Sequence, residues 1–230
     1  PYFGYFHAHC DLADQGHAEG SVQDAFNGAR AANMEFFGLS EHCKMVQESN
    51  GEWTELEQLT APMYDPGEFV ALHGCEYSQD DEGHAVVMNF DWHNGWPRSR
   101  HEDYNTWTKL LENFVADRPN VVMQLAHPGD IPENAALCCD GMEPDSNGYY
   151  TRSIAVMELF NASKTLEHYM WSQGWFADGH NLSFYDEALQ CGWLIGAAGG
   201  GDDHHEEWST RSMMTGLWIA GPRSQALTRE

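Results

Sequence analysis

The sequence predicts an α/β fold in which a largely parallel sheet closes into a barrel. Short apolar segments of strand length recur along the chain and alternate with helical patterns or long polar connections. This alternation is typical of α/β domains, and seven or eight such units favour a barrel. Side chains that can bind metal follow the predicted strands, which is the position of catalytic residues in parallel barrels.

In the first half of the chain, the apolar pattern predicts four strands and two helices. Residues 2–7 form a strand that leads into a polar turn. Residues 21–32 form a helix, because Ser21 can cap it and apolar residues from Val22 onward recur on one face. The other elements of this half are strands at 34–40, 68–74 and 84–90 and a weakly helical segment at 52–63.

The second half predicts two further helices and four further strands. A helix at 103–116 precedes a strand at 120–127, which Pro128 closes because proline cannot donate to a strand ladder. The remaining elements are strands at 153–160, 193–199 and 216–220 and a short helix at 183–191. The connections 91–102 and 128–151 are long, and long loops in compact domains often carry function.

Length and composition predict one domain that spans residues 1–230. The chain has 230 residues and 42% hydrophobic content, which is enough for one sizeable core. No apolar run reaches the roughly 18 residues of a membrane helix, so no membrane partner is expected. No signal peptide is recognisable. The sequence opens at Pro1 instead of Met, so export stays open beside a cytoplasmic location.

The chain is strongly acidic, with 36 acidic and 11 basic residues and a formal net charge of -25. This balance argues against nucleic-acid binding, which needs a basic surface. Two interpretations remain, namely a solvated acidic surface suited to a salty habitat, or carboxylates that hold cations. A metal site uses only a handful of carboxylates, so most of them are expected on the surface. The six cysteines form no zinc-ribbon pattern, and we expect mostly free thiols.

The most informative pattern is the set of polar residues at the strand ends. In chain order these are His7, His9, Glu41, His42, Glu76, His84, His127, Glu158, Asp202, Asp203, His204 and His205. The carboxyl ends of parallel strands meet at one rim, and a His-x-His pair on a strand points both rings to one face. Imidazole and carboxylate are ligands for zinc, manganese or iron. The set therefore predicts a metal site.

Each residue taken alone also has a structural interpretation. A His-x-His pair can occur by chance, His127 can simply end its strand, and Glu158 can pair with a neighbour or face solvent. The pairs Asp202/His204 and Asp203/His205 have the same spacing, so both stay open. We expect structural or surface roles for His17, His73, His93, His101, His168 and His180. The metal hypothesis rests on the whole set, because buried unpaired ionisable groups are costly.

The segments that carry these residues resemble the motifs of the PHP (polymerase and histidinol phosphatase) superfamily and occur in the same order. They are HAHCDLADQG at 7–16, LSEHC at 39–43, HGCEYS at 73–78, GHAVVMNF at 83–90, LAHPGD at 125–130 and GGDDH at 200–204. The G-x-E-Y form of the third segment and the closing TGLWIA most resemble the carbaryl-hydrolase-like branch. The departures are Ala13, Gln15, Ser40, Glu41 and Gly201, which stand where the motifs have Ser, Gly, Thr, Asp and Ser.

The resemblance implies a distorted (β/α)7 barrel of the PHP type with up to three divalent ions. By motif, the first ion takes His7, His9, Glu76 and Asp202. The second shares Glu76 and takes His127 and His84, and the third takes Asp14, His42 and His204. The changed residues around Asp14 leave a binuclear centre as an alternative.

The sequence thus predicts a metal-dependent hydrolase with two or three ions of zinc, manganese or iron. A metal-activated hydroxide would attack a small-molecule ester, with catalytic roles for Glu76, His84, Asp202 and Lys44. Phosphoesters (mono-, di- or triesters) come first, and carboxylic or carbamate esters are the alternative on the same site. The other candidate anion contacts are Arg98, Arg100 and Arg211. A non-catalytic metal-binding or scaffold domain is the alternative from another class.

Overall fold

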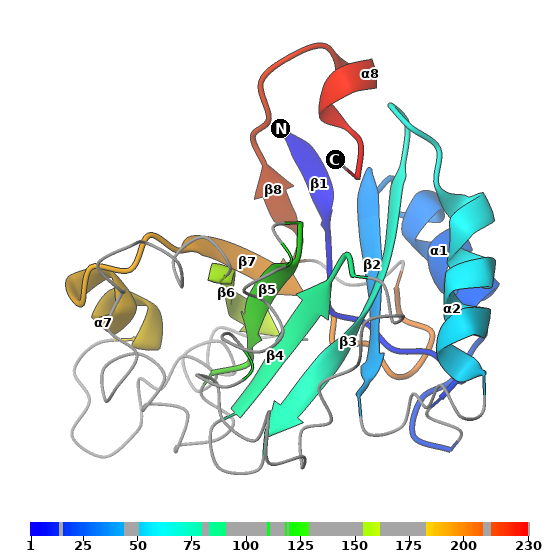
Figure 1. Ribbon diagram of the computed structural model, residues 1–230, viewed down its shortest axis with the longest axis horizontal. Coiled ribbons are helices and arrows are strands. Elements are labelled where there is room, and N and C mark those ends of the chain that lie inside the picture. The colour runs from blue at the N-terminus through cyan, green and yellow to red at the C-terminus, as the bar shows by residue number, and fades with distance from the viewer. Residues whose placement is uncertain are drawn as a thin grey trace.

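The strands form one eight-stranded mixed sheet in the order β7-β6-β5-β4-β3-β2-β1-β8 (Figure 1). The computed structural model describes residues 1–13, 16–43, 51–79, 83–90, 110, 118, 120–128, 154–161, 183–208 and 213–229. The strands are β1 (Tyr2–Tyr5), β2 (Phe36–His42), β3 (Val70–Gln79), β4 (Gly83–Met88), β5 (Val122–Ala126), β6 (Ile154–Asn161), β7 (Gly196–Gly200) and β8 (Thr215–Leu217).

The sheet consists of two parallel blocks separated by one reversed strand. Strands β1, β2 and β3 run parallel to one another, as do β5, β6 and β7. Strand β4 is antiparallel to both of its neighbours. Only residues 80–82 separate β3 from β4, and so short a connection joins only antiparallel strands. The start of β4 therefore lies at the same rim as the carboxyl ends of the parallel strands.

The sheet curves into a nearly closed barrel. Strand β8 pairs antiparallel with β1 at one edge of the sheet. Its Thr215 also reaches β7 at the other edge, where Oγ1 donates to the carbonyl of Gly199 at 2.9 Å and accepts from its N–H at 3.0 Å. The predicted α/β barrel is confirmed, and the eighth strand expected at 216–220 is present as β8. The sheet is mixed where we expected it to be largely parallel.

The described helices are α1 (Val22–Ala31), α2 (Glu52–Thr60), the 3-10 helix η2 (Ala61–Met63), α7 (Phe184–Gln190) and α8 (Arg223–Ala226). Helices α1 and α2 cover the outside of the sheet beside β2 and β3 (Figure 1). A capping box begins α1: Ser21 Oγ accepts from the Asp24 N–H, and Asp24 accepts from the Ser21 N–H. Among the described helices, none has the length and apolarity of a membrane span. The helix expected at 103–116 lies outside the described residues, apart from Leu110.

Alternate residues of the strands pack into two separate apolar clusters. On the outer face, Phe37 and Leu39 of β2 pack in a large cluster with Phe26 of α1 and Trp53 of α2. On the inner face lies a smaller cluster of Phe6, Phe36, Val70, Val86, Met88, Ala126 and Leu227. The inner cluster fills the barrel near the strand starts, as side chains do in closed parallel barrels.

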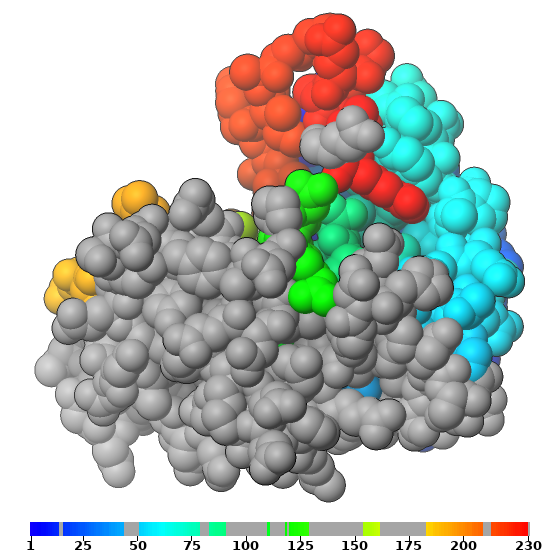
Figure 2. Space-filling model, in the orientation of Figure 1, coloured from blue at the N-terminus to red at the C-terminus, as the bar shows by residue number. Residues whose placement is uncertain are grey.

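The C-terminal segment closes this filled end of the barrel. Arg223 Nε donates to the carbonyl of Gly67 at 2.6 Å, and the Gly67 N–H donates to the carbonyl of Leu227 at 2.9 Å. In the space-filling view the segment, coloured red, lies beside the cyan residues that precede β3 (Figure 2). Both ends of the chain therefore lie where β1 begins (Figure 1).

Candidate metal centre

The inner face of the barrel changes from apolar to ligand-bearing along β2 and β3. Side chains on one face of a strand recur at every second residue. Phe36 and His42 therefore share the inner face of β2, and Val70 and Glu76 share that of β3. His84 joins them from the start of the reversed strand β4. The same alternation that builds the inner core thus brings ligand side chains together at the opposite rim.

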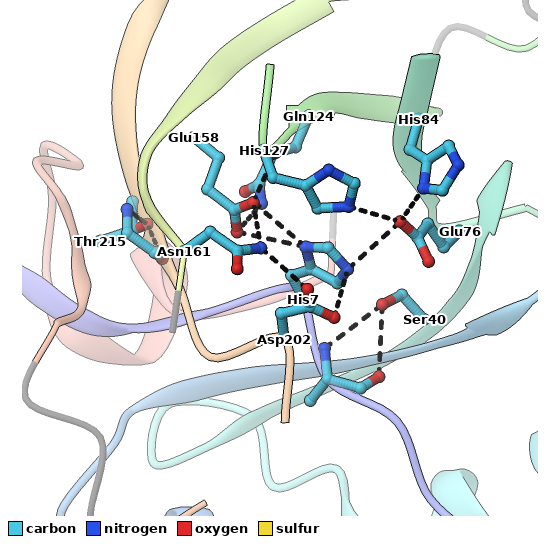
Figure 3. Close-up of polar contacts among 12 residues, drawn as sticks. His7, Ser40, Glu76, His84, Gln124, His127, Glu158, Asn161, Asp202 and Thr215 are labelled. Carbon is cyan, nitrogen blue, oxygen red and sulfur yellow. Dashed lines mark hydrogen bonds and ion pairs between the residues drawn. The ribbon is translucent and has the colours of Figure 1, made fainter. Parts of the chain in front are cut away.

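Glu76 lies at the middle of this group, and one of its oxygens meets three imidazoles (Figure 3). Oε1 is 2.8 Å from Nδ1 of His84, 3.0 Å from Nε2 of His127 and 3.6 Å from Nε2 of His7. The carboxylate is 1% exposed. So buried an oxygen, shared by three rings from three strands, is placed to share a cation with them.

The second oxygen of Glu76 meets two other imidazoles. Oε2 is 3.1 Å from Nε2 of His42 and 3.7 Å from Nε2 of His9. The rings of His9 and His42 stack with their centroids 4.4 Å apart. Each oxygen of Glu76 therefore has its own set of histidines, which is the arrangement of a carboxylate that bridges two metal ions.

Asp202 supplies a second carboxylate on the other side of the histidines. Its Oδ1 is 3.2 Å from Nε2 of His7, 3.3 Å from Nε2 of His9 and 3.6 Å from Nδ1 of His204. Asp202 follows β7 and has a left-handed backbone, with φ 43°. Backbone of this kind in a non-glycine residue is characteristic of functional sites.

Of the two Asp-x-His pairs left open by the sequence, Asp202 and His204 enter the centre. Asp203 is fully buried and accepts a hydrogen bond from the N–H of His205 at 2.8 Å. The His205 side chain is 67% exposed and lies 3.8 Å from Glu19. This second pair is therefore structural.

The two carboxylates are ionised. Burial alone would raise the pKa of Glu76, but hydrogen bonds from His127 and other imidazoles hold it well below its ordinary value. Burial likewise opposes ionisation of Asp202, yet the charge of His7 holds its pKa well below the usual range. Both side chains are therefore negative at neutral pH, which suits them to bind divalent cations.

The pKa values of His7, His9 and His127 are shifted in different directions. Burial lowers the pKa of His9 to about 4, so its ring is neutral at pH 7. Burial acts in the same direction on His127, but the hydrogen bond and charge of Glu76 outweigh it and raise the pKa to about 9. The pKa of His7 is also raised well above its ordinary value, because nearby carboxylates outweigh the burial of its ring. The protons on His7 and His127 therefore supply positive charge that a bound cation would otherwise supply to the carboxylates.

The donor set fits divalent metal ions. Four groups of three side chains each offer ligand atoms within 4.8 Å of one another. They are His9/His42/His204, His7/His9/Glu76, His7/His127/Asp202 and Glu76/His84/His127. Among the described residues, the buried Nε2 atom of His204 has no hydrogen-bond partner. A metal ion would satisfy such an atom, since imidazole and carboxylate are ligands for zinc, manganese and iron.

Most of the predicted site residues are thus brought together at one rim. Those that gather are His7, His9, His42, Glu76, His84, His127, Asp202 and His204. Their role as metal ligands stays a prediction. Asp14 and Lys44 lie outside the described residues. Glu41 lies on the other face of β2, where its buried Oε1 accepts from the N–H of Cys10 at 2.9 Å.

Two neighbours of the centre were not among the predicted metal ligands. His17 is exposed, and its ring centroid lies 4.8 Å from that of His204 and 5.3 Å from that of His42. It lies in a turn, so the alternation of side chains along a strand could not predict its position. Glu158 stood out as a strand-end carboxylate, but the sequence did not show whether it faces the histidines or the solvent. It is fully buried and contacts His7.

A disulfide joins Cys43 to Cys75 directly beside two of the candidate metal ligands, with Cα atoms 5.4 Å apart. Cys43 follows His42, and Cys75 precedes Glu76. The expectation of free thiols is wrong for this pair, because the parallel register of β2 and β3 brings their ends side by side. The free thiols among the described residues are Cys10 and Cys191.

No protein-family model matches the chain, and no curated protein matches its sequence. Solved structures do match it. PsfC from Pseudomonas syringae matches with a TM-score of 0.55 and 17% sequence identity, over 89% of this chain and 77% of PsfC. The likeness shows that the two chains share a fold.

Two other solved structures match with lower scores. One is a two-domain protein containing predicted PHP-like metal-dependent phosphoesterase from Bacteroides vulgatus, with a TM-score of 0.49 and 16% identity. The other is the lesion-specific endonuclease PfuEndoQ from Pyrococcus furiosus, with a TM-score of 0.46 and 10% identity. The match covers 89% of this chain in both cases, but 52% and 49% of the other chains. The chain therefore spans about half their length.

Proposed function

We propose that this chain is a metal-dependent hydrolase that binds two or three divalent ions and cleaves small-molecule esters. The observation that carries the proposal is the convergence of two ionised carboxylates and six imidazoles on one rim of the barrel. The resemblance of six segments to PHP motifs supports the same function. A site for one structural ion needs only four ligands, so this set is larger than a structural role requires.

Glu76 and Asp202 would hold the ions in place. Each Glu76 oxygen faces a different group of histidines, so the carboxylate can bridge two ions and fix their separation. Asp202 would hold an ion together with His7 and His9. His42 and His204 would bind a third ion together with Asp14. Bound ions of this kind lower the pKa of a bound water, and their positive charge stabilises a developing oxyanion.

His84 is suited to meet the substrate. Its side chain is 25% exposed, against 0% for His7 and 8% for His127. Its Nδ1 is bound to Glu76, so Nε2 is the nitrogen through which the ring could pass a proton to a leaving group. Lys44 would contribute a positive charge beside His42.

Phosphoesters are the substrate class we propose first. The chain contains only 11 lysines and arginines, whereas phosphate monoesters are usually held by arginine or lysine pairs. The scarcity of cations favours di- and triesters within this class. Carboxylic or carbamate esters are the alternative on the same site, in keeping with the resemblance to the carbaryl-hydrolase-like branch.

The test begins with metal content per chain, measured by plasma mass spectrometry on protein purified without chelator or nickel. Two to three equivalents of zinc, manganese or iron are expected. The loaded protein is then assayed on nitrophenyl phosphate mono-, di- and triesters and on nitrophenyl carboxylic and carbamate esters. Turnover of the esters is expected to require the bound metal.

Two variants sharpen the measurement. Glu76→Ala should lose both bound metal and turnover, because the shared carboxylate is removed. Glu68→Ala is the matched control, since it removes a 70%-exposed carboxylate beside the start of β3 and should keep both. A Glu76→Ala protein with full turnover would sink the proposal. Bound metal without turnover of any ester would favour the metal-binding or scaffold alternative.

A further inference from the structure

Glu158 of β6 is a fully buried carboxylate that lies beside the candidate ligands His7 and His127 (Figure 3). It receives hydrogen bonds from side chains and backbone of several segments. The donors are His7 Nδ1 at 3.2 Å to both oxygens, Gln124 Nε2 at 3.2 Å, the His127 N–H at 2.9 Å and Asn161 Nδ2 at 2.9 Å. A buried carboxylate with this many donors has the hydrogen bonds that its burial requires.

The contact with His7 determines which ring nitrogen faces the other ligands. Nδ1 of His7 donates to Glu158, so Nε2 points to the opposite side, 3.2 Å from Asp202 and 3.6 Å from Glu76. A neutral imidazole has one donor and one acceptor nitrogen, and the hydrogen bond at one nitrogen fixes the role of the other. When a metal ion replaces the proton on Nε2, the contact of Nδ1 with Glu158 would direct the Nε2 lone pair of His7 into the centre.

Glu158 also holds two further ligands through the backbone and through an amide. The N–H that it binds belongs to His127, whose φ of 25° lies in the left-handed region. Asn161 donates to Glu158 and, at 3.1 Å, to Asp202. Ligands from β1, from the end of β5 and from the end of β7 are therefore connected to one carboxylate.

The fold leaves room for this carboxylate. Gly200, at the end of β7, lies against Glu158, and a Cβ atom there would be 1.8 Å from Oε1. The same atom would be 3.2 Å from Cβ of His7. Only glycine at this position lets the carboxylate reach the ring of His7.

From these contacts we propose that Glu158 is a positioning residue that orients His7, and through backbone and amide contacts His127 and Asp202, for metal binding. The proposal rests on the proposed function, because it assigns a role towards the metal of that site. A carboxylate that binds the second nitrogen of a metal-bound histidine fixes the ring and raises its basicity. Removing such a partner typically lowers metal affinity about 10- to 100-fold.

The test compares Glu158→Gln with a matched control, Thr215→Val. Gln keeps the shape of Glu but is neutral, and its NH₂ group would replace one of the two oxygens that accept hydrogen bonds from His7. Thr215 is 2% exposed and bonds only backbone atoms of Gly199 among its described contacts. Its replacement perturbs a buried polar contact of the same barrel without touching the ligands.

Zinc affinity is measured on chelator-treated protein by competition with a chromophoric chelator, together with the melting temperature of the metal-free protein. We expect Glu158→Gln to bind zinc about 10- to 100-fold more weakly than wild type, and Thr215→Val to bind it equally well. A merely structural Glu158 would lower the melting temperature and leave the zinc affinity of the folded protein unchanged. That result would overturn the proposal.

A spectroscopic measurement on wild type keeps the test valid if Glu158→Gln fails to fold. In protein labelled with ¹⁵N-histidine, the proton on His7 Nδ1 should exchange slowly and resonate at low field, because its acceptor is a buried carboxylate. Assignment uses the loss of this signal in His7→Gln. Absence of a protected Nδ1 proton would overturn the proposal. Wild type that takes up no metal would instead overturn the proposed function, and the Nδ1 proton would still decide whether Glu158 orients the ring.

Discussion

At the scale of single residues, the centre depends on side chains that only the folded barrel brings together. The rings of His9, His42 and His204 lie within 5.6 Å of one another by centroid, although they come from three distant segments. Spacing along the chain predicted that strand-end histidines would meet. It could not choose between the two Asp-x-His pairs, because the turn after β7 decides which of them faces the histidines.

This choice leads to a prediction on neighbouring histidines. His204→Ala should lower the metal content, because His204 lies in the group with His9 and His42. His205→Ala should retain the wild-type content, because its side chain is 67% exposed and lies outside the centre. Metal per chain is measured for both variants by plasma mass spectrometry. Equal losses in the two variants would contradict this assignment.

At the scale of elements, the positions of the strands could be predicted better than their directions. Apolar runs located each strand that the described residues form, with shifts of a few residues at the ends. The prediction ended the third strand at residue 74, whereas β3 continues to Gln79. Residues 75–78 are buried and belong to the strand, although they include the polar residues Glu76 and Ser78. Because the third strand was predicted too short, its tight connection to β4 was not recognised. The antiparallel direction of β4, which brings His84 to the rim, was therefore not predicted.

Helix α1 provides a prediction at this scale. Its N-terminus is fixed by the Ser21–Asp24 capping box, and loss of an N-cap side chain typically costs about 1 kcal/mol. Ser21→Ala should therefore lower the free energy of unfolding by about 1 kcal/mol in urea denaturation. Ser21→Asp is the control that keeps an acceptor at the N-cap and should stay close to wild type. A stability of Ser21→Ala equal to wild type would show that the cap contributes nothing.

At the scale of the whole molecule, the net charge of -25 opposes compactness. Repulsion among surface carboxylates weakens a fold, and salt screens it over a Debye length of about 10 Å at 0.1 M. Composition alone predicts this repulsion, and the single domain that length and composition predict stays a prediction. The closure of the barrel needed the structure, because no pattern in the sequence indicates that Thr215 of β8 bonds to Gly199 of β7.

The charge predicts a response to salt. The melting temperature should rise from low to molar potassium chloride, because screening weakens the repulsion. It is measured by calorimetry at fixed pH, on metal-free protein so that changes in metal binding do not contribute. A melting temperature that stays flat over this range would mean that the acidic surface does not limit stability.

Both ends of the chain lie at the filled end of the barrel, away from the histidine-bearing rim (Figure 1). A group attached to residue Pro1 or close to Arg229 would therefore project away from the histidine-bearing rim. Such attachments should leave diffusion of small molecules to the rim unhindered.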